Sequence, residues 1–156
     1  MNEAVHGYYE RYWSEDGWVP HVRECRFPDR LRNLIAREVG PQSRVLDAGC
    51  GDGGKYGTWL ASLVAEYRGV DISENAVMAA RARGLDAMRA DDISQLPFAD
   101  GSFDICMCVE VLEHLVFPLD CARELWRLLK PGGVLIATVP NTTYWRRRLD
   151  FALFGR

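Results

Sequence analysis

Three glycines, Gly49, Gly51 and Gly54, follow a short apolar run and are spaced as G-x-G-x-x-G. Glycine lets the backbone N–H groups of a turn approach a ligand closely, but several nucleotide-binding folds share this spacing. Asp47 ends the apolar run, and its carboxylate would repel the phosphates of a dinucleotide and attract a cationic ligand. Because S-adenosylmethionine carries an ammonium and a sulfonium, the charge at this turn favours it as the ligand.

Acidic residues also end three further runs that the sequence predicts to be strands. They are Asp71, Asp92 and Glu110. In an open α/β sheet, ligands bind outside the carboxyl ends of the strands, where the strand order reverses. Acidic strand ends would suit a cationic ligand that also bears hydroxyl groups and an amine. Two alternatives stay open: Asp71 could cap the next helix, and Asp92 could belong with Asp91 to a solvated turn.

The elements that must position these residues alternate along the chain. Strands are expected at 45–48, 66–70, 85–90, 103–109 and 134–139, and helices at 28–39, 74–83 and 118–129, with a further helix after the glycine turn. The run 103–109 is apolar at nearly every position, which is typical of a strand buried on both faces. This order predicts an α/β fold: a Rossmann-like open parallel sheet with right-handed crossovers and helices on both faces.

Helical spacing of apolar residues predicts which helix faces are buried. The expected buried sets are Tyr8 and Tyr12 in an N-terminal helix, Leu31, Leu34, Ile35 and Val39 in the second helix, and Ala122, Leu125, Trp126 and Leu129 in the last. The aromatic N-terminal helix has two interpretations, a helix that packs on the body or a lid over a bound ligand.

Composition is that of one soluble domain. The chain has 156 residues and a formal net charge of −3, which argues against a general nucleic-acid binder. No run approaches the roughly 20 apolar residues of a membrane span. Five cysteines form no C-x-x-C pair, and Cys106 and Cys108 are expected in the core, so we predict a reduced, cytoplasmic protein. Within the domain we expect an N-terminal helical segment or lid (1–40), a cofactor-binding core (41–141) and a basic C-terminal helix or truncated tail (142–156).

The chain closely resembles the class I S-adenosylmethionine-dependent methyltransferases of the type 11-like group. The matching pieces, in order, are VLDAGCGDGG, VDIS, DDISQLPFADGSFD, CVEVLEHL and LKPGGVLIATVPN. The resemblance implies a role for each residue of the site, in chain order: Asp47 near the ammonium, Gly49 and Gly51 as close backbone, Asp71 on the ribose hydroxyls, Ile72 against the adenine, Asp92 and Ile93 at the adenine amine, and Val109 at the start of the loop passing the methionine moiety. A complete fold of this family adds two more strands, which are missing here. Either the chain is truncated or another chain covers the open sheet edge, which makes a homo-oligomer conceivable.

The segment Glu110–His114 resembles the ubiquinone-biosynthesis O-methyltransferases, and Arg30 resembles an arginine that those enzymes place near the cofactor carboxylate. We take His114 and Glu110 as candidate catalytic residues, with His114 as a general base for a hydroxyl acceptor, beside the alternative of a structural histidine. The pattern Glu110-x-x-Glu113-His114 binds magnesium in some relatives, but no metal is expected here. The tail after Val139 resembles the methionine-biosynthesis methyltransferase-like proteins.

The sequence therefore predicts methyl transfer from S-adenosylmethionine, with S-adenosylhomocysteine as the product, to a hydroxyl, amine or carboxylate of a small molecule. One alternative is a methyltransferase-like binding or scaffold protein without turnover. The other is a nicotinamide-dependent oxidoreductase, which Asp47 beside the phosphate position disfavours.

Overall fold

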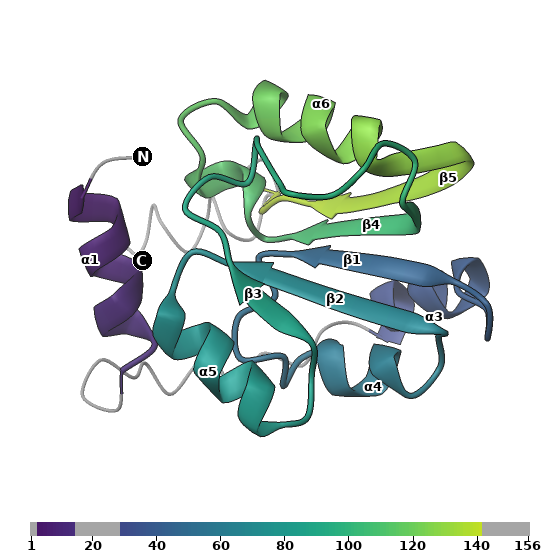
Figure 1. Cartoon of the computed structure of the whole chain (residues 1–156), viewed down its shortest axis with the longest axis horizontal. Helices are drawn as coiled ribbons and strands as arrows, with labels where there is room; N and C mark the ends of the chain where they lie inside the picture. The colour runs from purple at the N-terminus through teal and green to yellow at the C-terminus, as the bar shows by residue number, and fades with distance from the viewer. Residues whose placement is uncertain (1–2, 15–28, 142–156) are drawn as a thin grey trace, which may run out of the picture.

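The structure, a computed structural model, describes residues 3–14 and 29–141. Its elements in chain order are α1 (Glu3–Tyr12), α3 (Asp29–Glu38), β1 (Arg44–Ala48), α4 (Gly57–Ala61), β2 (Glu66–Asp71), α5 (Glu74–Ala82), β3 (Ala87–Arg89), β4 (Phe103–Val109), the 3-10 turn η2 (Leu112–His114), α6 (Pro118–Leu128) and β5 (Leu129–Thr138) (Figure 1). Residue 28, where the second helix was expected to begin, and the tail 142–156 fall outside the described residues.

The five strands form one parallel sheet in the order β3-β2-β1-β4-β5. The chain goes outward from β1 to β3 and then returns to place β4 on the other side of β1. The strand order therefore reverses between β1 and β4, and the loops that follow these two strands lie side by side. The predicted Rossmann-like parallel sheet is confirmed.

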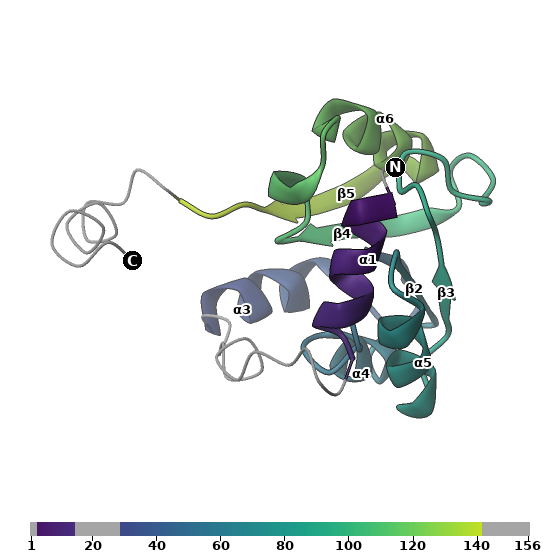
Figure 2. The same ribbon diagram turned by 90° about the vertical axis from the view of Figure 1, so that its left-hand side faces the viewer.

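Helices cover both faces of the sheet. Helices α3, α4 and α5 pack on one face through a cluster that includes Ile35, Leu60 and Val77. Helix α6 and the segment before β4 cover the other face through a second cluster. Helix α1 belongs to neither layer: it crosses the edge of the sheet at which the strand arrows end (Figures 1 and 2).

Local sequence explains where several elements begin and end. Ser73 precedes α5 and its hydroxyl accepts from the Ala76 N–H at 3.3 Å, while Gly84 takes a φ of +81° just after the helix. Cys106 and Cys108 on β4 are buried, as expected for a central strand. Two predicted boundaries are wrong: β3 forms only over Ala87–Arg89, and β5 starts directly at Leu129, so the Pro131–Gly133 turn lies inside it.

Three predicted buried side chains are exposed. Tyr8 on α1, Leu34 on α3 and Trp126 on α6 point away from the body, with Trp126 76% exposed. In α6 the buried positions are instead Cys121, Glu124, Leu125 and Leu128, which follow the i, i+3, i+4, i+7 spacing of a single face. Trp126 lies outside that face although its neighbour Leu125 lies in it.

Strand β5 forms an edge of the sheet, since its described residues pair with β4 alone. Leu135 and Val139 are exposed there. The open edge agrees with the sequence expectation, and association through it stays a prediction. None of the helices in the described ranges is long and apolar enough to cross a membrane.

The two neighbours on α6 give a direct test of this packing. Leu125→Ala is expected to lower the free energy of unfolding by about 2–5 kcal/mol, because Leu125 is 1% exposed within the core. Trp126→Ala is expected to change it by no more than about 0.5 kcal/mol, as for other surface positions. Urea denaturation followed by circular dichroism measures both, and equal losses in the two variants would contradict the described orientation of α6.

Candidate functional site

The glycine turn after β1 is held in place by its neighbours on both sides. Gly49 and Gly51 have φ of +84° and +56°, a region that favours glycine. The N–H groups of Gly49 and Cys50 both donate to the Val70 carbonyl of β2, at 2.8 and 3.0 Å. On the β4 side, a Cβ on Gly49 would lie 2.2 Å from Cγ2 of Val111. The turn is therefore enclosed between the ends of β2 and β4, which lie on either side of β1.

Asp47 lies beneath this turn and is 5% exposed. The Tyr67 hydroxyl of β2 donates to its Oδ2 at 2.8 Å. Burial raises the pKa of Asp47 to about 6, although the Tyr67 hydrogen bond opposes the shift. Tyr67 was not singled out from the sequence, because nothing in its local pattern shows that its hydroxyl reaches a carboxylate on the neighbouring strand.

Asp71 at the end of β2 joins the glycine turn to helix α5. Its Oδ2 accepts from the Gly51 N–H at 2.8 Å and its Oδ1 accepts from the Ser73 N–H at 3.0 Å. Burial raises its pKa, while these N–H donors oppose the shift. The contact with the Ser73 N–H is of the kind that the capping alternative implies, and the role of Asp71 toward ribose hydroxyls stays a prediction. Ile72 follows it and is half-buried.

Asp92 lies in an exposed loop after β3, and Ile93 beside it packs against the core. The Asp92 Oδ1 accepts from the N–H and the hydroxyl of Ser94, at 2.9 and 2.7 Å. These hydrogen bonds, chiefly the one from the hydroxyl, lower its pKa. The contacts are those of the solvated turn that the sequence left open as an alternative, and a role toward adenine stays a prediction.

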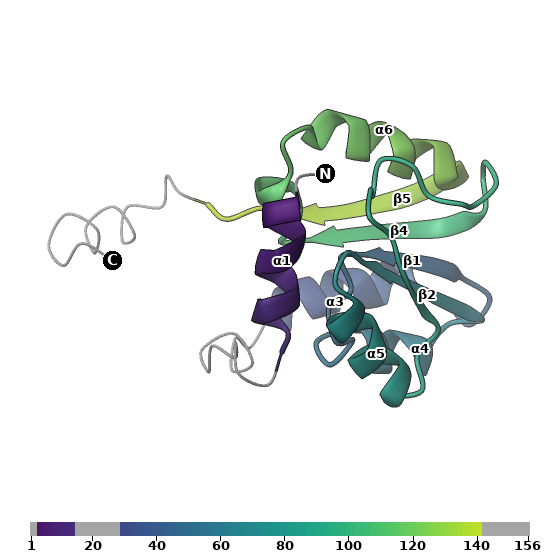
Figure 3. The ribbon, with the colours of Figure 1, turned by 60° about the vertical axis from the view of Figure 1, so that its left-hand side comes forward.

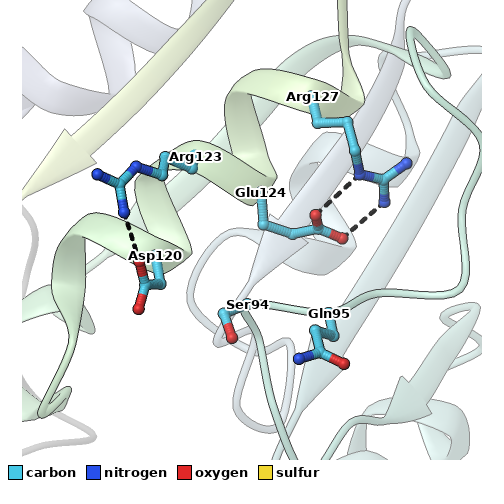
Figure 4. Close-up of a pocket in the computed structure, with 6 residues that line it drawn as sticks. All are labelled: Ser94, Gln95, Asp120, Arg123, Glu124 and Arg127. Atoms are coloured by element: carbon cyan, nitrogen blue, oxygen red, sulfur yellow. Dashed lines mark hydrogen bonds and ion pairs between the residues drawn. The ribbon is translucent and has the colours of Figure 1, made fainter.

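A cavity of about 370 Å³ lies between α6 and the segment after Asp92 (Figure 4). It is lined by Ser94, Gln95, Asp120, Arg123, Glu124 and Arg127. Arg127 contacts the carboxylate of Glu124 through two nitrogens, at 2.8 and 2.6 Å. Glu124 also accepts from the Leu96 N–H at 2.7 Å. None of the predicted site residues lines this cavity. Hydrogen bonds of Glu124 with the Leu96 N–H and of Arg127 with the Leu96 and Phe98 carbonyls join the segment after Asp92 to α6.

The end of β4 carries the second half of the site. Val109 is half-buried, and Glu110 has a φ of +58°, which costs free energy in a residue other than glycine. Thr138 of β5 stabilises this conformation: its hydroxyl accepts from the Glu110 N–H at 3.1 Å and donates to the Glu110 Oε1 at 2.8 Å. Strained backbone of this kind concentrates at functional sites, so Glu110 stays a candidate.

His114 ends the short 3-10 turn after β4, and its side chain is 54% exposed. Its Nε2 lies 3.9 Å from the Glu113 Oε1, and its ring lies 6.0 Å from that of Tyr9, nearly perpendicular to it. Among the residues described, no three or more His, Cys, Asp or Glu side chains are placed to hold a metal ion together. The structure therefore does not bring Glu110, Glu113 and His114 into a metal site.

Helix α1 lies at the same edge of the sheet (Figure 3). Aromatic side chains of α1, and Trp13 just after it, contact the site residues. A Cβ on Gly51 would lie 2.7 Å from Cζ2 of Trp13, so the Trp13 ring lies directly against the glycine turn. Desolvation raises the pKa of Tyr9 to about 12, and nearby Asp71 and Glu113 contribute to the shift. Arg30 lies exposed in the first turn of α3, and none of the hydrogen bonds found joins it to the other predicted residues. The positions of Trp13 and Tyr9 agree with the lid interpretation of the N-terminal helix. The predicted role of Arg30 near the cofactor carboxylate has no such support.

The residues present fit a cationic ligand with hydroxyl groups. A buried carboxylate is costly unless it is paired. A ligand ammonium would favour ionised Asp47, and ligand hydroxyls would find acceptors on Asp71. The glycine turn lies between them, with Val111 against Gly49 and Trp13 against Gly51.

Comparison with known proteins places these features in one family. The methyltransferase domain family matches residues 46–137. A ubiquinone biosynthesis O-methyltransferase from Xanthomonas campestris is 36% identical over 139 residues, covering 85% of this chain and 57% of that relative. This chain therefore spans little more than half of that protein.

Two solved structures are also similar. An S-adenosylmethionine-dependent methyltransferase from Mesorhizobium loti is 28% identical, with a TM-score of 0.66, and the match covers 74% of this chain and 53% of that one. The [4+2]-cyclase SpnF is 32% identical, with a TM-score of 0.63, over 71% of this chain and 44% of that one.

Proposed function

The chain belongs to the S-adenosylmethionine-dependent methyltransferases, and on this premise we propose that it transfers a methyl group to a hydroxyl oxygen of a small-molecule acceptor. The observation that carries the choice of oxygen is the 36% identity with a ubiquinone biosynthesis O-methyltransferase, across the residues that form the site. His114, exposed in the 3-10 turn after β4, is a side chain able to take a proton from a hydroxyl, which agrees with the same choice.

In this proposal the chain's own residues divide between holding the methyl donor and preparing the acceptor. Asp47 binds the donor's ammonium and Asp71 its ribose hydroxyls, while Gly49 and Gly51 keep the backbone close to it. When bound, S-adenosylmethionine supplies a methyl group on a positively charged sulfur, which is a good leaving group. Much of the acceleration then comes from holding the acceptor oxygen in line with the methyl and the sulfur.

His114 would act on the acceptor. A hydroxyl is a weak nucleophile, and a base that takes its proton as the oxygen–carbon bond forms raises the rate. A neutral imidazole accepts a proton on its unprotonated ring nitrogen, and the exposure of His114 lets it return the proton to water. The Tyr9 ring beside it would limit where an acceptor can lie.

The experiment offers the full chain three acceptors with S-adenosylmethionine: a catechol, a primary amine and a carboxylic acid. We expect S-adenosylhomocysteine to form together with a methylated catechol, and Asp71→Ala to abolish the signal. His114→Gln is expected to lower kcat by about a hundredfold, the scale of general base catalysis. Methylation of the amine or the acid in place of the catechol would show that the choice of oxygen is wrong.

A second candidate function is use of the same fold without methyl transfer. The observation that favours it is the similarity to a solved [4+2]-cyclase, with which the chain shares 32% sequence identity. Binding of S-adenosylhomocysteine, without its formation from S-adenosylmethionine in the presence of any of the three acceptors, would favour this candidate.

A further inference from the structure

Helix α1 is the part of the molecule that the proposed reaction leaves unexplained. It lies across the carboxyl end of the sheet instead of on either face (Figures 2 and 3). Tyr9, Glu10 and Trp13 contact the body, whereas Tyr8 is exposed. Tyr9 and Trp13 are four positions apart and Glu10 lies between them in the sequence, so the three inward side chains share one side of α1 and of the residue that follows it.

Glu10 makes the main polar contact of this helix. Its Oε1 accepts from the Glu74 N–H at 2.6 Å, and its Oε2 accepts from the Asn75 N–H at 3.3 Å and from the Ser73 hydroxyl at 3.1 Å. In return, the Asn75 side-chain amide donates to the Glu10 carbonyl at 3.0 Å. A residue more than 60 positions away in the sequence thus binds the first turn of α5.

This contact uses groups that a helix cannot satisfy by itself. The first N–H groups of a helix have no partner within it, and the positive end of the helix dipole favours an anion there. Ser73 caps the Ala76 N–H, and Glu10 takes the two N–H groups before it. Partial burial opposes ionisation of Glu10, but the hydrogen bonds from Glu74, Asn75 and Ser73, with nearby His6, lower its pKa overall. The carboxylate is therefore ionised at neutral pH.

The contact lies beside the residues proposed to hold the methyl donor. Ser73, which binds Glu10, also donates its N–H to Asp71, and Asp71 binds the Gly51 N–H of the glycine turn. Trp13, three positions after Glu10 and directly after the end of α1, lies against that same Gly51. Glu10 and Trp13 therefore hold α1 against the ends of β2 and β1, and Tyr9 contacts His114 beyond the end of β4.

We propose that α1 forms a closing wall of the cofactor site, and that Glu10 is the positioning residue that holds this wall against the first turn of α5. With Glu10 bound, Trp13 covers the glycine turn and slows the exchange of the cofactor. Release of Glu10 lets α1 move away and frees the turn. The inference rests on the cofactor site of the proposed function but not on the identity of the acceptor.

The test uses the full chain and two independent readouts. The first is hydrogen exchange at the backbone amides of Glu74 and Asn75 without ligand. The second is the dissociation rate of S-adenosylhomocysteine, followed as release of the radiolabelled compound after dilution into excess unlabelled compound. The variants are Glu10→Ala, Glu10→Gln and Trp13→Ala, and Glu38→Ala on the exposed side of α3 is the matched control.

We expect Glu10→Ala to speed both exchange at the two amides and cofactor dissociation by about tenfold or more, the scale of a lost charge-assisted hydrogen bond. Glu10→Gln keeps one acceptor oxygen and should lie between Glu10→Ala and the unmodified chain. Trp13→Ala should speed dissociation while the amides of α5 stay protected, and Glu38→Ala should change neither.

Unchanged amide exchange in Glu10→Ala would show that Glu10 does not hold α1 against the first turn of α5. Faster exchange with an unchanged dissociation rate, in both Glu10→Ala and Trp13→Ala, would show that α1 is no wall of the site. The proposed methyl transfer fails or succeeds separately. If the variants show these differences but the chain methylates no acceptor, the role of α1 stands and the proposed methyl transfer is wrong. If the chain methylates an acceptor but the variants show no differences, the methyl transfer stands and the role of α1 is wrong.

Discussion

Asp47→Asn is expected to weaken the binding of S-adenosylhomocysteine by at least about a hundredfold. The change keeps the size of the side chain and its hydrogen bond with Tyr67 but removes the negative charge. Removing one partner of a buried charge pair costs about 3–5 kcal/mol, because the other charge is left uncompensated. Isothermal titration calorimetry at pH 7.5 measures the difference directly.

The same carboxylate predicts how binding depends on pH. Burial raises the pKa of Asp47 in the free protein to about 6, well above the value of an exposed aspartate. An acid with a raised pKa in the folded state is ionised at a cost, so the free protein loses stability as pH rises from about 4 to about 6. A cationic ligand favours the ionised form, and its affinity should rise with pH through about 6 and then level off.

In Asp47→Asn this rise should largely disappear. A residual slope would come from Asp71, whose pKa burial also raises. Asp104→Asn is the matched control: Asp104 opens β4 at the opposite edge of the sheet, where it binds Lys130 and the Arg44 N–H. It should cost some stability and leave the affinity unchanged. Equal affinities in Asp47→Asn and the unmodified chain, with both folded, would refute the assigned role of Asp47.

The second large effect is expected at Gly49. Gly49→Ala places a Cβ 2.2 Å from Cγ2 of Val111 at a φ of +84°. The left-handed conformation costs about 1–2 kcal/mol in a residue with a side chain, and forced overpacking adds about 1–3 kcal/mol. We expect the free energy of unfolding to fall by about 2–5 kcal/mol and cofactor binding to be lost, as the turn must move away from Val111.

Gly84 offers an unusually close control for this prediction. Its φ is +81°, almost that of Gly49, but a Cβ there would meet nothing within 4 Å. Gly84→Ala should therefore show the backbone cost alone. Val111→Ala combined with Gly49→Ala should recover the steric part, with a coupling energy between the two sites of about 1 kcal/mol or more. Equal losses at Gly49 and Gly84 would mean that Val111 does not restrict the turn.

Much of this fold was predictable because its signals are local. The strand Phe103–Val109 was predicted to the residue, since an apolar run bounded by turns marks a strand buried on both faces. Ser73 and Gly84 marked the ends of α5 for similarly local reasons. The orientation of Trp126 was not predictable in the same way. Helix α6 packs on the sheet through one face only, and an apolar residue on another face stays exposed.

For the site as well, local features were predictable and long-range contacts were not. The sequence by itself determined the order of strands and helices, the glycine turn with Asp47 beneath it, and the acidic residues that end the strands. Each of these depends on residues that lie within a few positions of one another. The comparisons then showed the family to which the chain belongs.

Only the tertiary structure decided which side chains meet at the site. Tyr67 reaches Asp47 from 20 positions away, Val111 packs on Gly49 from 62, and Glu10 binds α5 from more than 60. These contacts exist because β1 lies between β2 and β4 in a parallel sheet whose strand order reverses beside it, and because α1 crosses the carboxyl edge of the sheet. The pairing of strands and the docking of a helix depend on the whole chain, and no short stretch of sequence contains them.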